Sequence, residues 1–186
     1  MSHNKPSRLR FAINLGNAVL AHLGETGKPA GITVELSHRL ATRWGVSAEF
    51  VPYPAAGKVV ADAGGEHWDI AFLAIDPARE ATLRFTSPYI TIHASLHRLP
   101  SSQEAIDAFL AGEGDMVAGI RQPLEATARQ HAGVRVLADN FTEIQQAICV
   151  ARADVDRFHA VNDALSEWRA DGSLQALIAG HLGQAN

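Results

Sequence analysis

The fold is decided by residues 68–79, which read Trp-Asp-Ile-Ala-Phe-Leu-Ala-Ile-Asp-Pro-Ala-Arg. Apolar residues fill consecutive positions in the first half of this run, which is typical of a strand buried on both faces. The Asp76-Pro77 pair then predicts a turn, because proline fixes the backbone angle that a turn needs. Arg79 follows within that turn. The run therefore predicts a buried strand over 68–73 that leads into a short helix.

The regions before this run alternate between strand-like and helix-like periodicity. They predict strands over 9–15 and 47–52, an amphipathic helix over 32–44 and a second helix over 55–63. Together with the central strand this is a β-α-β-α-β pattern, which indicates a parallel sheet crossed by helices. The remaining predictions are an edge ribbon over 19–23, strands over 90–96, 116–120, 134–137 and 145–151, and helices over 103–110, 123–131, 155–169 and 173–182.

Composition excludes several classes of protein. The 186 residues carry 16 Lys and Arg against 20 Asp and Glu, a formal charge of −4, and 47% are hydrophobic. These values exclude disorder and coiled coil, and without a basic cluster we expect no nucleic-acid partner. No apolar stretch approaches the roughly 18 residues of a membrane span, so we expect no membrane insertion. One cysteine excludes an internal disulfide and a thiolate zinc site.

The central run, followed by Phe85-Thr86-Ser87-Pro88-Tyr89, resembles the family 3 extracellular solute-binding proteins, the amino-acid-type receptors of ABC importers. The spacing from Arg79 to Phe85 matches that family's pattern. Gly31-Ile32-Thr33-Val34-Glu35-Leu36 is similar to its first helix entry, and 162–183 to its two closing helices around an Asp-Gly turn. The resemblance covers most of the chain from about Leu9 onward.

The resemblance implies an α/β fold of the periplasmic-binding-protein-like type II. In that fold two lobes are joined by hinge strands and close on a solute between them. We expect residues 1–92 with 152–186 to form lobe one and 93–151 to form lobe two. The hinge strands would be 89–96 and 147–151, with the closing helices packed on lobe one.

The same resemblance implies where a ligand binds. In the family the arginine after the turn grips the ligand's α-carboxylate, and here it is Arg79. Its planar fork suits a carboxylate held by two hydrogen bonds. The other candidate ligand-binding residues are Phe72 and Ala74 on the strand, Asp76 in the turn and Asn17 in the first loop. The alternative is that Arg79 forms only an ion pair, with Asp76, Glu80 or an acid of lobe two.

Several family features are replaced in this sequence. Phe72 and Ala74 stand where the family has a glycine and a Ser or Thr that receive the ligand's ammonium. Ile120 falls where a lobe-two aspartate neutralises that ammonium, and Asn17-Ala18-Val19-Leu20 occupies the region of the stacking aromatic. An unpaired buried ammonium costs several kcal/mol. We therefore expect a small anionic ligand without an amine, or no small ligand.

Lobe two is also short. The chain passes from 96–100 almost directly into the helix predicted over 103–110, so we expect that a βαβ-sized unit of roughly 30 residues or more is missing. That unit would carry a Gly-Ser/Thr loop at a helix N-terminus, which helps to hold the carboxylate. A lobe of about 60 residues is marginal and would expose a sheet edge. We therefore expect a homodimer formed through a truncated lobe two.

Other combinations of residues give no catalytic site, metal or cofactor. His93 and His97 are four residues apart, but no glutamate completes a zinc pattern. Cys149 lies in an apolar run, which predicts a buried and unreactive thiol. The N-terminal residues lack a secretory apolar core, so we expect a cytoplasmic protein if the sequence is a full reading frame. If it is trimmed from a longer chain, we expect the periplasm.

These observations favour a solute-binding module that binds a small carboxylate-bearing ligand or has lost ligand binding, and not an enzyme. Two alternatives stay open. One is a non-binding scaffold that acts through self-association or a protein partner. The other is an enzyme similar to the cyclohexadienyl and arogenate dehydratases, which the missing unit and the missing lobe-two acid disfavour.

Overall fold

The computed structural model describes residues 7–95, 106–107, 110–111, 119–131, 136 and 142–183. The chain forms two compact units. Unit 1 comprises Met1–Ile90 and Gln146–Asn186, and unit 2 comprises Thr91–Gln145. The boundaries expected from the sequence, after 92 and after 151, stay predictions. Residues 147–150, which fall in lobe two by that prediction, are fully buried within unit 1.

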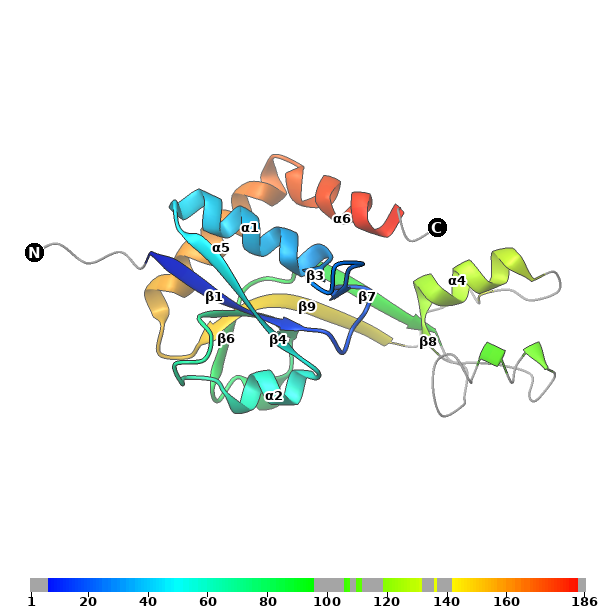
Figure 1. Cartoon of the computed structure of the whole chain (residues 1–186), viewed down its shortest axis with the longest axis horizontal. Coiled ribbons are helices and arrows are strands. Elements are labelled where there is room, and N and C mark those ends of the chain that lie inside the picture. The colour runs from blue at the N-terminus through cyan, green and yellow to red at the C-terminus, as the bar shows by residue number, and fades with distance from the viewer. Residues whose placement is uncertain are drawn as a thin grey trace, which may run out of the picture. The chain divides into compact units, whose positions relative to one another are not determined.

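Most elements belong to unit 1 (Figure 1). Its strands and helices are β1 (Arg8–Asn14), β2 (His22–Leu23), β3 (Pro29–Ala30), α1 (Ile32–Trp44), β4 (Ser47–Tyr53), α2 (Ala56–Ala61), β5 (Ile70–Ala74), the short 3₁₀ helix η1 (Pro77–Arg79), β6 (Leu83–Phe85), α5 (Val155–Ala170) and α6 (Ser173–Gly183). The strands β7 (Ile90–Ser95) and β9 (Thr142–Ala151) cross between the units. The described elements of unit 2 also include β8 (Gly119–Ile120) and α4 (Arg121–Gln130).

The sheet has the strand order β4-β1-β5-β9-β7-β8, with β6 also paired to β9. β1 lies parallel to β4 and to β5, so that Phe11 is opposite both Phe50 and Ile70. β9 returns antiparallel to β5 and β6. The parallel sheet crossed by helices that the sequence predicts is therefore confirmed.

The first helix begins and ends where the sequence predicts. Gly45 adopts a left-handed conformation (φ 63°), and its N–H bonds the carbonyl groups of the last turn of α1. At the other end Gly31 has φ 115°, and a Cβ there would lie 2.6 Å from the carbonyl oxygen of Leu20. Only glycine therefore allows the β2–β3 hairpin to approach the start of α1. This hairpin replaces the edge ribbon predicted over 19–23.

Among the boundaries that differ from the predicted ones, those of α2, β5 and β9 differ by two or three residues. α2 ends at Ala61 rather than 63, because the chain turns at 62–65. β5 begins at Ile70 rather than 68, and the buried Trp68 before it donates its indole N–H to the carbonyl of Val59 at 3.1 Å. β9 begins at Thr142, three residues before the prediction.

The core of unit 1 surrounds its central strands. Phe11 and its neighbour Ala12 in β1, and Ile70 and Leu73 in β5, are at most 1% exposed, and each pair points to opposite faces of the sheet, so β1 and β5 are buried on both faces. Cys149 is fully buried in the same core, and burial raises the pKa of its thiol. This confirms the prediction of a buried cysteine.

The closing helices pack on unit 1 as the sequence predicts. The Arg43 guanidinium donates two hydrogen bonds of 2.7 Å to the Glu167 carboxylate, which joins α1 to α5. The Arg39 side chain donates to the carbonyl of Ser173 at 3.2 Å, at the start of α6. Figure 1 shows α1 and α6 on one side of the sheet and α2 on the other.

In unit 2, β7 pairs antiparallel with β8, and α4 follows β8 directly. α4 confirms the helix predicted over 123–131, although it begins two residues earlier. Most of the strand predicted over 134–137, of the helix predicted over 103–110 and of the strand predicted over 116–120 lies outside the described residues.

Candidate functional site

The candidate site lies at the carboxyl edge of the parallel strands of unit 1. β1, β4 and β5 run in one direction, so the segments 15–17, 54–56 and 75–79 that follow them meet at one edge of the sheet. The Leu15 N–H donates to the carbonyl of Tyr53 at 2.8 Å and ties two of these segments together. This edge is where open α/β sheets generally bind ligands.

The turn after β5 is held by its own polar groups. The Asp76 carboxylate caps η1 by accepting from the N–H of Ala78 at 2.9 Å, and Pro77 occupies the first turn of that helix. The Arg79 N–H donates to the Asp76 carbonyl at 2.9 Å. The predicted turn onto a short helix is thereby confirmed, and it fixes the backbone from which the Arg79 side chain extends.

The Arg79 guanidinium is held in position by two contacts that involve only some of its N–H donors. Its Nη1 donates to the carbonyl of Ala74 at 3.2 Å, and its Nε lies 3.6 Å from Oδ2 of Asp76. Within the described part of the chain, Nη2 has no hydrogen-bond partner. The side chain of Arg79 is 24% exposed and that of Asp76 is 44% exposed. A weak pair of this kind holds the fork in place while leaving donors for a carboxylate.

Phe72 and Ala74 play different parts. The Phe72 ring is 2% exposed and meets the ring of Tyr89 edge-on, with 6.0 Å between centroids. This side chain therefore belongs to the core. Ala74 is half-buried and contributes its carbonyl oxygen to Arg79.

Asn17 shapes the loop after β1. Its Oδ1 accepts from the Val19 N–H at 3.2 Å, and its carbonyl accepts from the N–H groups of Leu20 and Ala21 at 3.0 Å each. The structure therefore brings Ala74, Asp76 and Arg79 together through hydrogen bonds and an ion pair. Among the described contacts, none joins Asn17 or the Phe72 side chain to that group.

Two tyrosines at this end of unit 1 were not assigned a role from the sequence. Tyr53 ends β4, and its hydroxyl donates to the Asp62 carboxylate at 2.7 Å. Burial, followed by this hydrogen bond, raises the pKa of Tyr53 to about 12. The Tyr89 hydroxyl is buried without a hydrogen-bond partner among the described residues, and burial raises its pKa as well. The Pro88-Tyr89 pair in the family pattern was the available signal for Tyr89.

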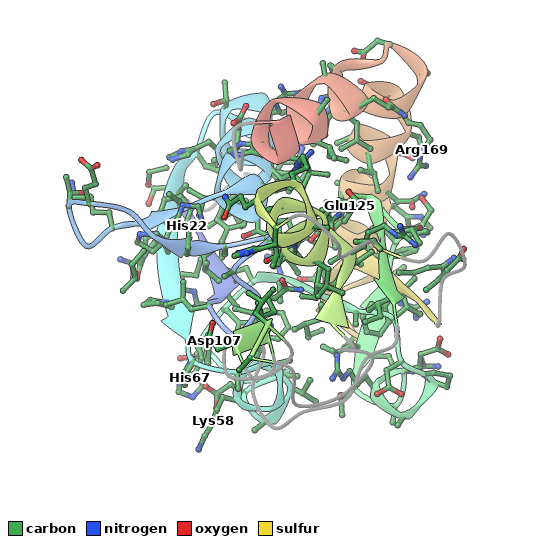
Figure 2. The ribbon with its side chains drawn as sticks, turned by 90° about the vertical axis from the view of Figure 1, so that its right-hand side faces the viewer. His22, Lys58, His67, Asp107, Glu125 and Arg169 are labelled. Carbon is green, nitrogen blue, oxygen red and sulfur yellow. The ribbon has the colours of Figure 1, made fainter. Side chains whose placement is uncertain are left out.

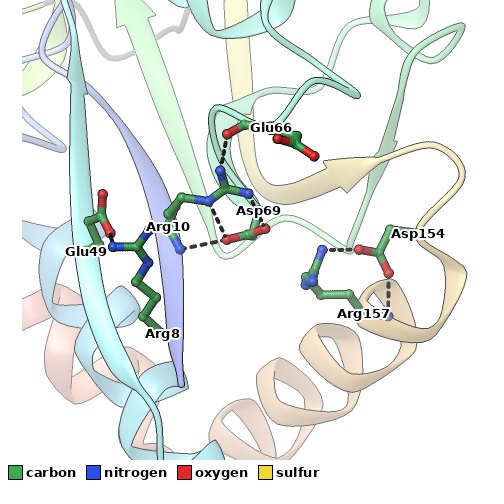
Figure 3. A network of polar contacts seen from close by, with 7 residues as sticks. All are labelled: Arg8, Arg10, Glu49, Glu66, Asp69, Asp154 and Arg157. Carbon is green, nitrogen blue, oxygen red and sulfur yellow. Dashed lines mark hydrogen bonds and ion pairs between the residues drawn. The ribbon is translucent and has the colours of Figure 1, made fainter. Parts of the chain in front are cut away.

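The opposite edge of the sheet carries a closed network of charges (Figure 3). The backbone N–H and side-chain Nε of Arg10 donate to Oδ2 of Asp69 at 2.8 and 3.1 Å, and its Nη2 donates to Oδ1 at 3.0 Å. Arg10 also donates from Nη1 to the carbonyl of Glu66. Burial favours a higher pKa for Asp69, but the hydrogen bonds and charge of Arg10 outweigh it and hold the pKa below 3.8.

Unit 2 contains a helix start of its own. α4 follows β8 at Ile120, whose apolar side chain cannot cap the first turn, and the Arg121 Nη1 donates to Glu125 at 3.3 Å. Oε1 of Gln122 is buried without a partner among the described residues. The sequence predicts that a βαβ-sized unit with a ligand-binding loop at a helix N-terminus is missing between residues 96–100 and 103. That part of the chain lies outside the described residues.

The described residues provide neither a metal site nor a membrane-spanning helix. They contain no group of three or more His, Cys, Asp or Glu side chains that could hold a metal ion. His97 lies outside the described residues, as does the side chain of His93. In the described part, no helix is both long and apolar enough to span a membrane.

Comparison with solved structures supports the fold. One match is a putative binding component of an ABC transporter from Wolinella succinogenes, complexed with lysine (TM-score 0.75, 18% identity, 93% of this chain and 94% of that chain). Another is a mutant of ArgBP from T. maritima (TM-score 0.72, 18% identity, 95% and 96%). A third is an ancestral amino acid-binding protein described as a precursor of cyclohexadienyl dehydratase (TM-score 0.71, 17% identity, 95% and 95%). Such low identities establish the periplasmic-binding-protein-like type II fold and nothing finer.

Comparison by sequence identifies the family. No curated protein matches the chain. The model for bacterial extracellular solute-binding proteins, family 3, matches residues 9–184, which is nearly the whole chain and includes both units. The chain belongs to family 3 of the bacterial extracellular solute-binding proteins.

Proposed function

We propose that the protein is a binding module for a small carboxylate-bearing solute, and that Arg79 holds the carboxylate. The observation that carries the proposal is the state of the Arg79 guanidinium. Ala74 and Asp76 fix its direction, yet its Nη2 has no partner among the described residues. A planar fork with free donors at the carboxyl edge of a parallel sheet suits an anionic group.

The environment of Arg79 also bears on the rest of the solute. The side chains of Phe72 and Ala74 carry no oxygen, so they offer an ammonium group no side-chain acceptor, and the Ala74 carbonyl already accepts from Arg79. Asp76 is the nearby acid, and its two carboxylate oxygens already contact Ala78 and Arg79. An uncompensated ammonium in a closed site costs several kcal/mol. We therefore favour a carboxylate without an α-amine over the amino acids that the similar structures bind.

A thermal-shift screen tests this proposal. The panel contains monocarboxylates, dicarboxylates, amino acids and the carboxamide analogue of each. We expect stabilisation by at least one carboxylate, none by its amide, and loss of the shift in Arg79→Gln. Arg84→Gln is the matched control, because Arg84 is also half-buried in unit 1 and donates to one backbone carbonyl, that of Arg152. Stabilisation that persists in Arg79→Gln would refute the role of Arg79.

Self-association is the second candidate. Unit 2 spans only 91–145, which is below the size of about 60 residues at which a single core is already marginal. We propose that two copies pair through this unit. Light scattering should then give twice the mass of one chain at micromolar concentration, and a monomer at that concentration excludes this pairing.

The dehydratase alternative has less support. The similar ancestral protein is itself described as amino acid-binding, and as a precursor of the enzyme. Turnover of a cyclohexadienyl acid by the purified chain would establish this activity. The binding proposal predicts no turnover.

A further inference from the structure

We infer that Arg169, near the end of α5, is the positioning residue for the start of the connection between the two units. The inference concerns a hinge, so its functional meaning rests on the proposed binding function. The contacts that carry it all lie within unit 1. Figure 2 marks Arg169 among the side chains of the molecule.

The Arg169 side chain clamps the segment that precedes the outgoing strand. Its Nη1 donates to Oγ of Ser87 at 3.1 Å, and its Nη2 donates to the carbonyl of Pro88 at 2.7 Å. The chain leaves unit 1 two residues later, after Ile90. One guanidinium thus fixes two adjacent residues immediately before the crossing.

The same segment is tied to the returning strand. The Thr86 N–H donates to the carbonyl of Ile148 at 2.9 Å, and the Ile148 N–H donates back to Oγ1 of Thr86 at 3.2 Å. The Tyr89 N–H donates to the carbonyl of Gln146 at 2.9 Å. Gln146 is the residue at which the chain re-enters unit 1. Residues 86–89 therefore join the bases of both connections.

The clamp has a firm support. Glu167, two residues before Arg169, accepts the two 2.7 Å hydrogen bonds from Arg43 of α1. α5 is therefore anchored to the body of unit 1 beside the clamp. Residues 86–89 are therefore fixed both by Arg169 of α5 and by the backbone of β9. We infer that bending between the units begins after Tyr89.

Both ends of the segment 86–89 and its partner Gln146 are buried, so movement of this segment would be energetically costly. Thr86, Gln146 and Tyr89 are each at most 6% exposed, and within the described part of the chain the Tyr89 hydroxyl has no hydrogen-bond partner. Movement of the segment would break buried hydrogen bonds, which are costly to leave unmade. Arg169 itself lies on the surface, so it can hold the segment without being part of the core.

Hydrogen exchange of the full chain without ligand tests the inference. In Arg169→Gln we expect the amides of Thr86, Tyr89 and Ile148 to exchange about tenfold faster, because the clamp that limits local opening is lost. Arg169→Lys retains one donor and should show a smaller increase. Arg152→Gln is the matched control, because Arg152 also donates to a backbone carbonyl in unit 1, that of Glu80, but lies away from 86–89. Unchanged exchange of the three amides in Arg169→Gln would overturn the inference.

A distance measurement separates a hinge role from a purely local one. Spin labels at Lys58→Cys in unit 1 and Gln130→Cys in unit 2 occupy exposed positions, while buried Cys149 stays unlabelled. We expect Arg169→Gln to broaden the distribution of distances between the labels, and Arg152→Gln to leave it unchanged. An unaltered distribution would reduce Arg169 to a local stabiliser and overturn the hinge role. Neither readout uses a ligand, so failure of the binding proposal would be seen separately.

Discussion

The two edges of the unit 1 sheet each carry an arginine beside an aspartate, and the two pairs are built differently. Arg10 and Asp69 share three hydrogen bonds of 2.8–3.1 Å, and their side chains are 25% and 16% exposed. Arg79 and Asp76 share one contact of 3.6 Å, and Asp76 is 44% exposed. The first pair satisfies both partners, whereas the second leaves guanidinium donors available. We therefore propose that Arg79, which is held by the weaker pair, is the arginine that binds a solute.

The largest expected effect concerns the closed pair. Asp69→Ala should lower the free energy of unfolding of unit 1 by about 3 kcal/mol, because it leaves the Arg10 charge partly buried without its partner. Trp44, Trp68 and Trp168 all belong to unit 1, so tryptophan fluorescence during urea unfolding reports on that unit. Glu49→Gln is the control, because Glu49 pairs with Arg8 on the surface and should cost less than about 0.5 kcal/mol. Equal losses of unfolding free energy in Asp69→Ala and Glu49→Gln would show that the Arg10–Asp69 pair contributes no more than a surface pair.

Acid should weaken the same pair. The pKa of Asp69 is held below 3.8 in the folded chain, so the unfolded chain takes up the proton first as the pH falls. The stability that the pair contributes is therefore complete above about pH 4 and is lost as the pH falls through the folded pKa. The urea midpoint of the wild type should fall more steeply below pH 4 than that of Asp69→Asn. Parallel curves for the two proteins would contradict this.

A smaller loss of stability is expected for the Tyr53–Asp62 hydrogen bond, which lies at the same edge of the sheet as Arg79. Tyr53→Phe removes the hydrogen bond to Asp62 and should cost about 1.5 kcal/mol in urea unfolding. Burial raises the pKa of Tyr53 to about 12, and it raises the pKa of Tyr89 as well. The stability that Tyr53 contributes is thus complete below its unfolded pKa of about 10 and is lost as the pH rises toward 12. Absorbance should show no tyrosinate formation with a midpoint near pH 10 in the folded protein, which has only these two tyrosines.

The smallest effect on stability is expected at the open pair. Arg79→Gln should lower the free energy of unfolding by at most about 1 kcal/mol, because its ion pair is long and its aspartate is exposed. The same urea experiment measures this. A cost as large as that of Asp69→Ala would mean that Arg79 is a structural residue and would remove the reason to regard it as a binding group.

The sequence predicts unit 1 better than the site. The bounds of α1 and the presence of the closing helices and of the buried strand follow from periodicity and glycine caps, which are local signals. The position of Arg79 after the turn follows from the Asp76-Pro77 pair. The hydrogen bonds of Arg169 and Tyr53 could not be predicted, because they join residues that only the tertiary fold brings together. Asn17 was predicted as a contact of the ligand, whereas its described bonds hold its own loop.

The most direct measurement is calorimetric titration of the wild type and Arg79→Gln with the carboxylate found in the screen and with its carboxamide. We expect saturable binding of the carboxylate by the wild type. Arg79→Gln should bind the carboxylate, and the wild type should bind the amide, at least about hundredfold more weakly, since a charge-assisted pair is lost in both cases. Equal affinity of Arg79→Gln and the wild type for the carboxylate would refute the role of Arg79, as would the absence of binding to any carboxylate in the panel.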